Sequence, residues 1–235
     1  MPFRFKQFSV DDKRTAMKVG TDGVLLGAWG YLPDTGRILD VGAGSGLIAL
    51  MAAQRGAGRV TVDAVEIDMG AAGDAKDNFC ASPWGDRMNL FCEDFKTFAV
   101  SCRHKYDAVF SNPPYFRNSL LPDEAGRVTA RHTAALEYDE LFRSVAKLLS
   151  AEGRFSLVTP SDSYDDIARI ALENSLYLTR LTYVSTIYGI KHKRILSEWG
   201  STPSDYVMEN LAIEKSPGHY TEEYIRLVKD FYINM

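Results

Sequence analysis

The stretch Arg37–Ala52, RILDVGAGSGLIALMA, contains the pattern that decides the fold. It begins with a short apolar run typical of a buried strand and ends with an apolar run suited to a helix. Between the two runs, Gly42, Gly44 and Gly46 allow the backbone to approach a ligand closely. A strand, a glycine loop and a helix in this order predict a Rossmann-like α/β fold. Such a fold has a mostly parallel sheet, helices on both faces and a cofactor at the helix N-terminus.

Asp40, near the end of the predicted strand, indicates which kind of cofactor the loop binds. A dinucleotide-binding loop has the pattern G-x-G-x-x-G, whereas the sixth position here is Leu47. A carboxylate beside the loop would repel a pyrophosphate and favour a cation or a ligand rich in amino and hydroxyl donors. S-adenosylmethionine has a sulfonium, an amino group and ribose hydroxyls, so it fits this loop better than NAD does.

The next two predicted strands are also followed by acidic residues. The strand 60–65 ends at Glu66, which is placed to accept hydrogen bonds from both ribose hydroxyls of a cofactor. Asp68 is the alternative for that role, or it caps the helix that follows. The strand 88–92 precedes Asp94, which either accepts from the amino group of the cofactor adenine or caps the short segment after it.

A fourth apolar run, 106–110, leads into the sequence SNPPYF at 111–116. Neither proline has an N–H to donate, so the strand must stop and a stiff loop must follow. The loop offers the amide of Asn112, the carbonyl of Pro113 and an aromatic ring, which together suit a planar amino group. The alternative is an ordinary strand-ending turn. The polar segment 117–136 is long for a connection, which favours a functional loop.

The remaining patterns continue the alternation of helices and strands. Residues 3–10 suggest a short edge strand or arm, and Thr21 or Asp22 can cap the helix that follows. Other helices are expected over 69–80, 137–150, 164–174 and 220–231, and other strands over 155–159, 177–185, 195–199 and 206–213. No linker or repeat interrupts the chain, so we expect a single domain over 1–235. Within it, 1–30 forms an arm and a helix over the cofactor side, and 31–235 forms the core.

The composition is that of a globular protein without a global basic field. Of the 235 residues, 46% are hydrophobic and 25% are charged, and the net charge is −4. This charge weakens a nucleic-acid hypothesis but leaves room for a local basic face. The three cysteines lack CxxC spacing and the four histidines lack metal-ligand spacing, which favours reduced thiols and no metal. No segment is apolar enough to span a bilayer, so we expect a cytoplasmic protein, with a monomer favoured.

Several motifs together resemble a known enzyme family. The glycine loop, the acids after the next two strands and Asn-Pro-Pro-Tyr after the fourth are similar to class I S-adenosylmethionine-dependent amino-methyltransferases. The chain further resembles the bacterial tRNA adenine-N6 methyltransferases that modify valine tRNA next to its anticodon. This resemblance rests on FKQF at 5–8, MKVGTDG at 17–23, LGAW at 26–29, DVGAGSG at 40–46, SPW at 82–84 and FY at 231–232.

The resemblance implies a seven-stranded sheet with an antiparallel last hairpin and adenine 37 of valine tRNA as substrate. It implies S-adenosylmethionine as methyl donor and S-adenosylhomocysteine as product. Asn112 and Pro113 would accept the two N6 hydrogens of adenine, and Pro114 and Tyr115 would complete the catalytic motif. Tyr115 would stack on the flipped base with Phe116 as a second wall, unless Tyr115 is a core aromatic. The expected donor-binding residues are Asp40, Gly42, Gly44, Gly46, Glu66, Asp94 and Asn112.

Contacts to RNA are expected from basic side chains. Lys191, Lys193 and Arg194 share one turn and could hold phosphates, although a solvated charged turn is the alternative. Other candidates are Arg4, Lys6, Lys13, Arg14, Arg127 and Arg131.

Three other functions compete with RNA methylation. Asn-Pro-Pro-Tyr also serves methyltransferases that act on a glutamine side chain of a translation factor, on an rRNA base or on amines in DNA. The N-terminal motifs favour tRNA, and the lack of a separate target-recognition domain argues against DNA. An NAD-binding oxidoreductase is disfavoured by Asp40 and Leu47. A silent binding module is disfavoured by the complete set of cofactor and substrate positions.

Overall fold

The computed structural model describes residues 1–113 and 138–235. Its main sheet has nine strands in this described part, in the order β11-β10-β8-β9-β7-β6-β3-β4-β5. The strands are β3 (Gly36–Val41), β4 (Val60–Val65), β5 (Met88–Phe91), β6 (Tyr106–Ser111), β7 (Leu149–Pro160), β8 (Tyr177–Ile187), β9 (Arg194–Gly200), β10 (Val207–Ser216) and β11 (His219–Tyr220). The predicted parallel core and antiparallel hairpin are both present. The expected count of seven is corrected to nine, because β10 and β11 extend the sheet beyond β8.

The sheet is mixed in direction. The pairs β4–β5, β3–β4, β3–β6 and β6–β7 are parallel. β9 lies between β7 and β8 and is antiparallel to both, as the hairpin prediction requires. β10 is parallel to β8, so the carboxyl ends of β7, β8 and β10 lie at the same edge as those of the core strands.

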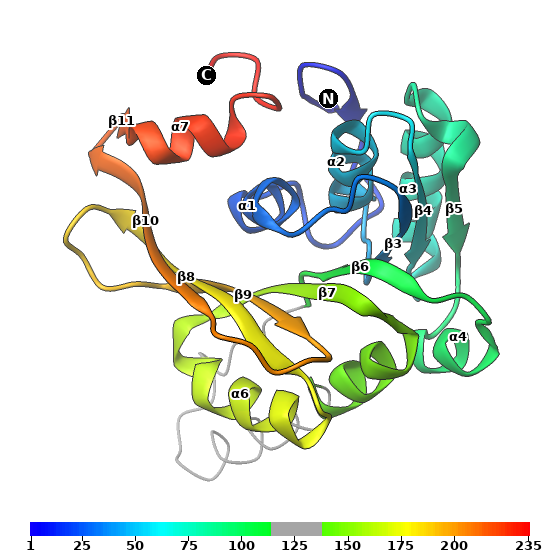
Figure 1. The fold of residues 1–235 in the computed structure, drawn as a ribbon. Coiled ribbons are helices and arrows are strands. Elements are labelled where there is room, and N and C mark those ends of the chain that lie inside the picture. Colours follow the sequence, from blue (N-terminus) through cyan, green and yellow to red (C-terminus); the bar gives the residue numbers. More distant parts are fainter. Residues whose placement is uncertain (114–137) are drawn as a thin grey trace, which may run out of the picture.

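Helices cover both faces of the sheet (Figure 1). On one face lie α1 (Thr21–Trp29), α2 (Leu47–Arg55), α3 (Met69–Ala81) and α7 (Glu222–Val228), whose apolar side chains share one core with that side of the sheet. On the other face lie α4 (Phe95–Ser101), helical residues 138–148 and α6 (Tyr164–Glu173), which form a second core. Short 3-10 turns occupy Gly85–Arg87 and Ser161–Ser163. The sheet is therefore buried on both sides, which explains the nearly continuous apolar runs of its central strands.

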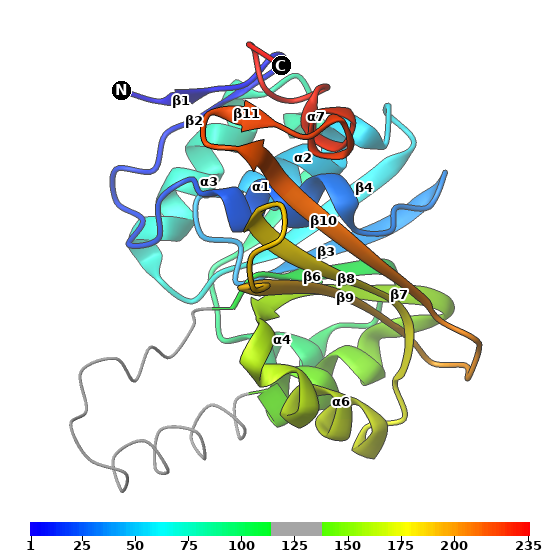
Figure 2. The same cartoon turned by 90° about the vertical axis from the view of Figure 1, so that its left-hand side faces the viewer.

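The N-terminal residues form a separate two-stranded sheet, β1 (Phe3–Arg4) and β2 (Ser9–Val10). This sheet lies beside the C-terminal end of the chain (Figure 2), where the Lys6 N–H donates to the carbonyl of Phe231 at 2.8 Å. The ring of Phe5 stacks on those of Phe8 and Tyr232, with centroids 4.6 and 5.8 Å away. These contacts explain the aromatic residues near both termini.

The start of α1 differs from the sequence-based expectation. Neither Thr21 nor Asp22 caps the helix, because its N-cap residue is Gly20 in an extended conformation. Asp22 instead accepts a hydrogen bond from Arg194 Nε at 2.9 Å. A distant ion pair therefore replaces the predicted local cap.

The register of the core strands brings four loops to one level. Val41 of β3 pairs with Ser111 of β6 and with Val65 of β4, which in turn pairs with Phe91 of β5. Ser111 Oγ also donates to the Val41 carbonyl at 3.0 Å. The chain turns to β4 and β5 on one side of β3 and to β6 and β7 on the other. The edge at Val41 is therefore the topological switch point where open α/β sheets bind ligands.

Candidate active site

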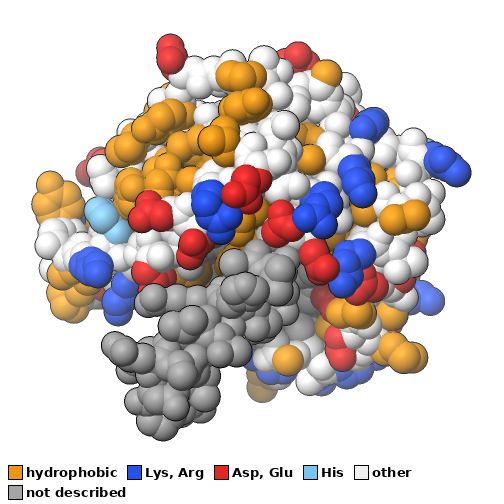
Figure 3. Space-filling view, turned by 90° about the horizontal axis from the view of Figure 1, so that it is seen from below, with side chains coloured by type: hydrophobic (Ala, Val, Ile, Leu, Met, Phe, Trp, Pro, Cys, Tyr) orange, Lys and Arg blue, Asp and Glu red, His pale blue; other side chains and the backbone are white. Residues whose placement is uncertain are grey.

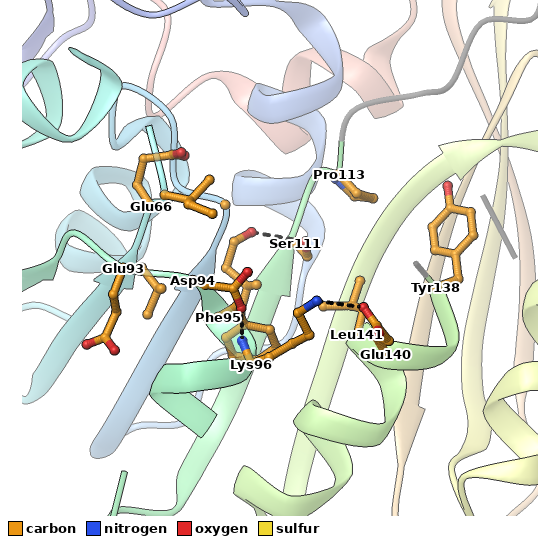
Figure 4. A pocket seen from close by; sticks show the side chains of 14 residues that line it. Glu66, Glu93, Asp94, Phe95, Lys96, Ser111, Pro113, Tyr138, Glu140 and Leu141 are labelled. Carbon is orange, nitrogen blue, oxygen red and sulfur yellow. Dashed lines mark hydrogen bonds and ion pairs between the residues drawn. The ribbon is translucent and has the colours of Figure 1, made fainter. Parts of the chain in front are cut away.

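Two adjoining cavities lie at this edge. The smaller, of about 350 Å³, is bounded by the ends of β3, β4, β5 and β6 and by helical residues 138–141. Figure 4 shows side chains from these elements around it, including Glu66, Asp94, Pro113 and Glu140. The larger, of about 590 Å³, lies between the glycine loop and residues 15–23. Both are lined by Gly42, Glu66 and Ile67, so they form two parts of one site.

The glycine loop needs glycine for two different reasons. Gly46 has φ of +81°, and a Cβ there would lie 2.4 Å from the ring of Phe79, so this position is constrained by packing against α3. Gly42 has φ of +70°, and a Cβ there would meet nothing within 4 Å. Gly42 lines both cavities, so its backbone forms part of the floor of the site. The predicted close approach of backbone and ligand is geometrically available at Gly42.

Asp40 does not face a ligand as predicted. Its side chain is 1% exposed and lines neither of the two cavities. Oδ2 accepts from the Ala49 N–H at 3.0 Å, and Oδ1 has no hydrogen-bond partner among the described residues. Burial raises the pKa of Asp40 to about 7; the hydrogen bond from Ala49 opposes this rise and the charge of Glu66 adds to it. Asp40 therefore braces the first turn of α2 behind the loop, and direct cofactor contact is not supported by the geometry.

This raised pKa predicts a pH dependence of stability. Because folding raises the pKa of Asp40 from 3.8 to about 7, the folded state retains a proton that the unfolded chain releases. Stability from this group is therefore lost as the pH rises from about 4 to about 7. We expect Asp40→Asn, which keeps an acceptor for Ala49, to gain up to about 4 kcal/mol of unfolding free energy relative to the unsubstituted protein between about pH 4 and pH 8. Urea unfolding of both proteins measures this, and a pH-independent difference would contradict it.

Glu66 stands at the junction of the two cavities. Its side chain is largely buried, Oε2 accepts from the Gly44 N–H at 2.8 Å, and Oε1 accepts from the Asp68 N–H at 2.8 Å. Asp68 is the N-cap of α3 and accepts from the Ala71 N–H at 2.8 Å. The helix-cap alternative for Asp68 is confirmed. Glu66 is the acid that the backbone orients at the centre of the site.

Asp94 caps a helix, as one of its two predicted roles requires, and its side chain also reaches the smaller cavity. It is the N-cap of α4, with Oδ1 accepting from the Lys96 N–H at 2.7 Å, and it also lines the smaller cavity. Beyond it, Lys96 Nζ pairs with Glu140 at 3.1 Å across the cavity, as Figure 4 shows. Sequence reasoning missed Ile67, Phe95, Lys96 and Glu140. Ile67 directly follows Glu66, and Phe95 directly follows Asp94. Their positions next to the strand ends could therefore have indicated that they line the site.

Asn112 and Pro113 separate the two cavities. Asn112 lines the larger cavity, Pro113 lines the smaller, and both side chains are half-buried. The Asn112 amide nitrogen lies 3.7 Å from Met17 Sδ, so Met17 also contacts this motif. The predicted roles of Pro114, Tyr115 and Phe116, and of Arg127 and Arg131, fall outside the described residues.

The basic turn lies at the same edge of the sheet as the cavities. It connects β8 to β9, and Ser161 at the end of β7 donates through Oγ to the His192 carbonyl at 2.8 Å. Lys191 and Lys193 are exposed, whereas Arg194 is half-buried and pairs with Asp22. Arg194 therefore helps to fix α1 and is a weaker candidate for RNA contact than the two lysines. Tyr188, which is 78% exposed on the same turn, was not predicted.

Charge on the surface is mixed. Figure 3 shows Lys and Arg side chains interleaved with Asp and Glu on the face drawn there. Within residues 1–113 and 138–235, no three His, Cys, Asp or Glu side chains gather as metal ligands would. In that same part of the chain, no helix has the length and apolarity needed to cross a membrane.

Known proteins resemble this chain in sequence and in fold. The family model of the methyltransferase small domain matches residues 24–175. The chain is 45% identical to a tRNA1(Val) (adenine(37)-N6)-methyltransferase of Bacteroides fragilis, covering 99% of this chain and 98% of that protein. It is 39% identical to one of the same description from Yersinia enterocolitica, covering 99% and 92%. A solved structure of a predicted O-methyltransferase from Agrobacterium tumefaciens has a TM-score of 0.68 at 18% identity, covering 89% of this chain and 96% of that one, and shares the fold.

Proposed function

Because the chain belongs to the family of tRNA1(Val) (adenine(37)-N6)-methyltransferases, we propose that it transfers a methyl group from S-adenosylmethionine to N6 of adenine 37 in valine tRNA. The family predicted from the sequence motifs is thereby confirmed. The main support for this reaction is the position of Asn112 and Pro113, which lie between two cavities at the switch point of the sheet. One cavity system can hold the donor while the motif holds the acceptor amine beside it.

The donor fits the residues that line the site. Glu66 would accept from the ribose hydroxyls, and Asp94 would accept from the adenine amine beside the apolar walls of Ile67 and Phe95. Four carboxylates, Glu66, Glu93, Asp94 and Glu140, line the smaller cavity together with one cation, Lys96. This negative balance suits a ligand rich in donors and carrying a positive centre. When bound, S-adenosylmethionine supplies a methyl group activated by its sulfonium.

The acceptor amine needs help because its lone pair is delocalised into the adenine ring. The Asn112 side-chain oxygen and the Pro113 carbonyl would each accept one N6 hydrogen. These bonds favour a tetrahedral nitrogen and stabilise the positive charge that develops on it. The nitrogen becomes strongly acidic as it is alkylated, so no dedicated general base is needed. Fixing both reactants at adjoining cavities can supply about 7–11 kcal/mol of the barrier reduction.

We further propose that the turn 188–193 contacts the tRNA. Lys191 and Lys193 would hold phosphates, and exposed Tyr188 offers a ring on which a base can stack. The double variant Lys191→Glu, Lys193→Glu should raise KM for tRNA several-fold and lower the salt slope of binding by about 1 for each phosphate that is no longer neutralised. Lys105→Glu is the control, because Lys105 is exposed before β6 at the opposite edge. Unchanged tRNA binding by the double variant would remove the turn from the interface.

We expect the protein to act in the cytoplasm as a monomer without a metal. Cys80, Cys92 and Cys102 are all free, and the first two are exposed, which suits a reducing compartment. Light scattering after size exclusion measures the oligomeric state.

Labelled methyl transfer to separate RNA, DNA and protein fractions tests the proposed substrate class. Label in RNA that digests to N6-methyladenosine is the expected result. Label in protein would indicate the glutamine-modifying alternative, and label in DNA would indicate a DNA methyltransferase. Titration with S-adenosylhomocysteine and with NAD distinguishes the methyltransferase from an oxidoreductase.

A further inference from the structure

The larger cavity has one wall made of irregular backbone. Residues 11–20, here called the cover segment, lie between β2 and α1, and residues 15–20 line the cavity opposite the glycine loop. The segment belongs to no helix or strand. Lys18 Nζ ties it internally by donating to the carbonyls of Asp12 at 2.5 Å and Thr15 at 2.8 Å. Its position over the cavity must therefore be fixed by contacts with other elements.

Asp74 of α3 supplies the first of these contacts. It is 2% exposed and accepts four hydrogen bonds from the cover segment. Oδ2 accepts from the Arg14 N–H at 2.7 Å, the Thr15 N–H at 2.9 Å and Thr15 Oγ1 at 2.8 Å, while Oδ1 accepts from Arg14 Nε at 2.7 Å. Burial alone would raise the pKa of Asp74, but the bonds from Arg14 and Thr15 hold it below its usual value. The ionised form of this buried carboxylate is thus stabilised by hydrogen bonds from the docked segment.

Asn78, one turn further along α3, supplies the second contact. Its Oδ1 accepts from the Asp11 N–H at 2.9 Å, and its Nδ2 donates to the Asp11 carbonyl at 2.8 Å and to the Ser45 carbonyl at 2.9 Å. Ser45 belongs to the glycine loop. One amide therefore joins the start of the cover segment to the opposite wall of the cavity.

The surface of α3 is shaped to receive the segment. A Cβ at Gly73 would lie 2.9 Å from Arg14 Nη1, and a Cβ at Gly70 would lie 3.3 Å from the Arg14 carbonyl. Glycine inside a helix is unfavourable relative to alanine. At Gly70 the neighbour in the segment is the Arg14 backbone, which indicates close contact between α3 and the segment, whereas at Gly73 the neighbour is the flexible end of the Arg14 side chain. The segment runs along α3 in Figure 2.

We propose that Asp74 and Asn78 are positioning residues that dock the cover segment over the larger cavity and thereby set the affinity for the methyl donor. This proposal rests on the proposed function, because it assumes that the donor extends from the smaller cavity past Glu66 and Gly42 into the larger one. Neither residue lines that cavity. Asp74 bonds only the cover segment among its lining residues, so its effect must pass through the segment, whereas Asn78 also acts through Ser45 of the glycine loop.

The test compares Asp74→Asn with Asp77→Asn. Each substitution removes one carboxylate of α3 that pairs with Arg14 of the cover segment. The side chain of Asp74 is 3% exposed, whereas that of Asp77 is 70% exposed. Asp74→Asn should weaken binding of S-adenosylhomocysteine about tenfold in calorimetry, because hydrogen bonds to a buried charge are removed. Trypsin should cleave after Lys13 and Lys18 about tenfold faster, since proteolysis follows the undocked population. Asp77→Asn should stay within about twofold in both measurements.

Two further measurements keep the outcome decisive. Arg14→Ala changes only an exposed side chain of the segment, so it should fold even if Asp74→Asn does not, and it should weaken binding in the same direction. If the unsubstituted protein fails to bind S-adenosylhomocysteine, the proposed function is wrong. If the unsubstituted protein binds the ligand, two results would overturn the positioning role. In the first, Asp74→Asn and Arg14→Ala bind the ligand as tightly as the unsubstituted protein does. In the second, they bind it weakly but trypsin cleaves the segment no faster.

Discussion

Asn112→Ala is expected to lower kcat for methyl transfer by at least about 10²–10³-fold while weakening donor binding far less. Asn112 is the first residue after β6 and lines the larger cavity beside Pro113, which lines the smaller one. Removing the amide leaves one N6 hydrogen without its acceptor. The developing charge on the nitrogen then loses its nearest oxygen.

Donor binding should survive this substitution because the acids and the glycine loop are untouched. The measurement is single-turnover methyl transfer to tRNA together with calorimetric titration of S-adenosylhomocysteine. Asn112→Asp is a useful companion, because it retains an oxygen acceptor and should keep more activity than alanine. Near-normal turnover by Asn112→Ala would show that the amide does not hold the amine.

Glu66→Gln should weaken binding of S-adenosylhomocysteine about 100-fold, although the two side chains have nearly the same shape. Each oxygen of Glu66 accepts from a backbone N–H, of Gly44 and of Asp68, at 2.8 Å. A glutamine has one oxygen, so its amino group would face one of these N–H groups. The loop around Gly44 would then shift, and the site would lose the charged acceptor for the ribose hydroxyls.

Asp68→Asn is the matched control for this prediction. Asp68 caps α3, and asparagine is an equally good N-cap residue, so stability should not change. If Glu66 binds the ribose, Asp68→Asn binds the ligand normally. If Asp68→Asn bound the ligand much more weakly and Glu66→Gln bound it normally, the ribose would be assigned to Asp68 instead of Glu66.

The sequence could predict the strands and their ends at the switch point because apolar runs there stop at polar residues. The fourth strand was expected over 106–110 and is observed as Tyr106–Ser111. The start of β7 was missed: it begins at Leu149 instead of 155, because Glu152 and Gly153 interrupt the apolar pattern. Of the two strands beyond β8, β10 was expected over 206–213 and is observed as Val207–Ser216, whereas β11 was missed because it has only two residues, both exposed.

Long-range contacts set the limits of prediction at the site. The strand position of Asp40 does not show that its carboxylate turns toward Ala49 and away from the cavity. Arg194 and Asp22 are 172 residues apart in the sequence, so their pairing has no local signal. Asp74 and Asn78 look like ordinary polar positions of a helix until the cover segment is seen against them. The acids Glu66 and Asp94 were predictable because strand ends position them directly.

Methylation of defined valine tRNA transcripts tests the central claim most directly. The protein, S-adenosylmethionine and either the natural transcript or one with adenine 37 replaced by guanine are incubated, and the RNA is digested for nucleoside mass spectrometry. N6-methyladenosine should form in the natural transcript alone, and Asn112→Ala should form almost none. Equal methylation of the two transcripts, or a methyl group on any other nucleoside, would contradict the assignment.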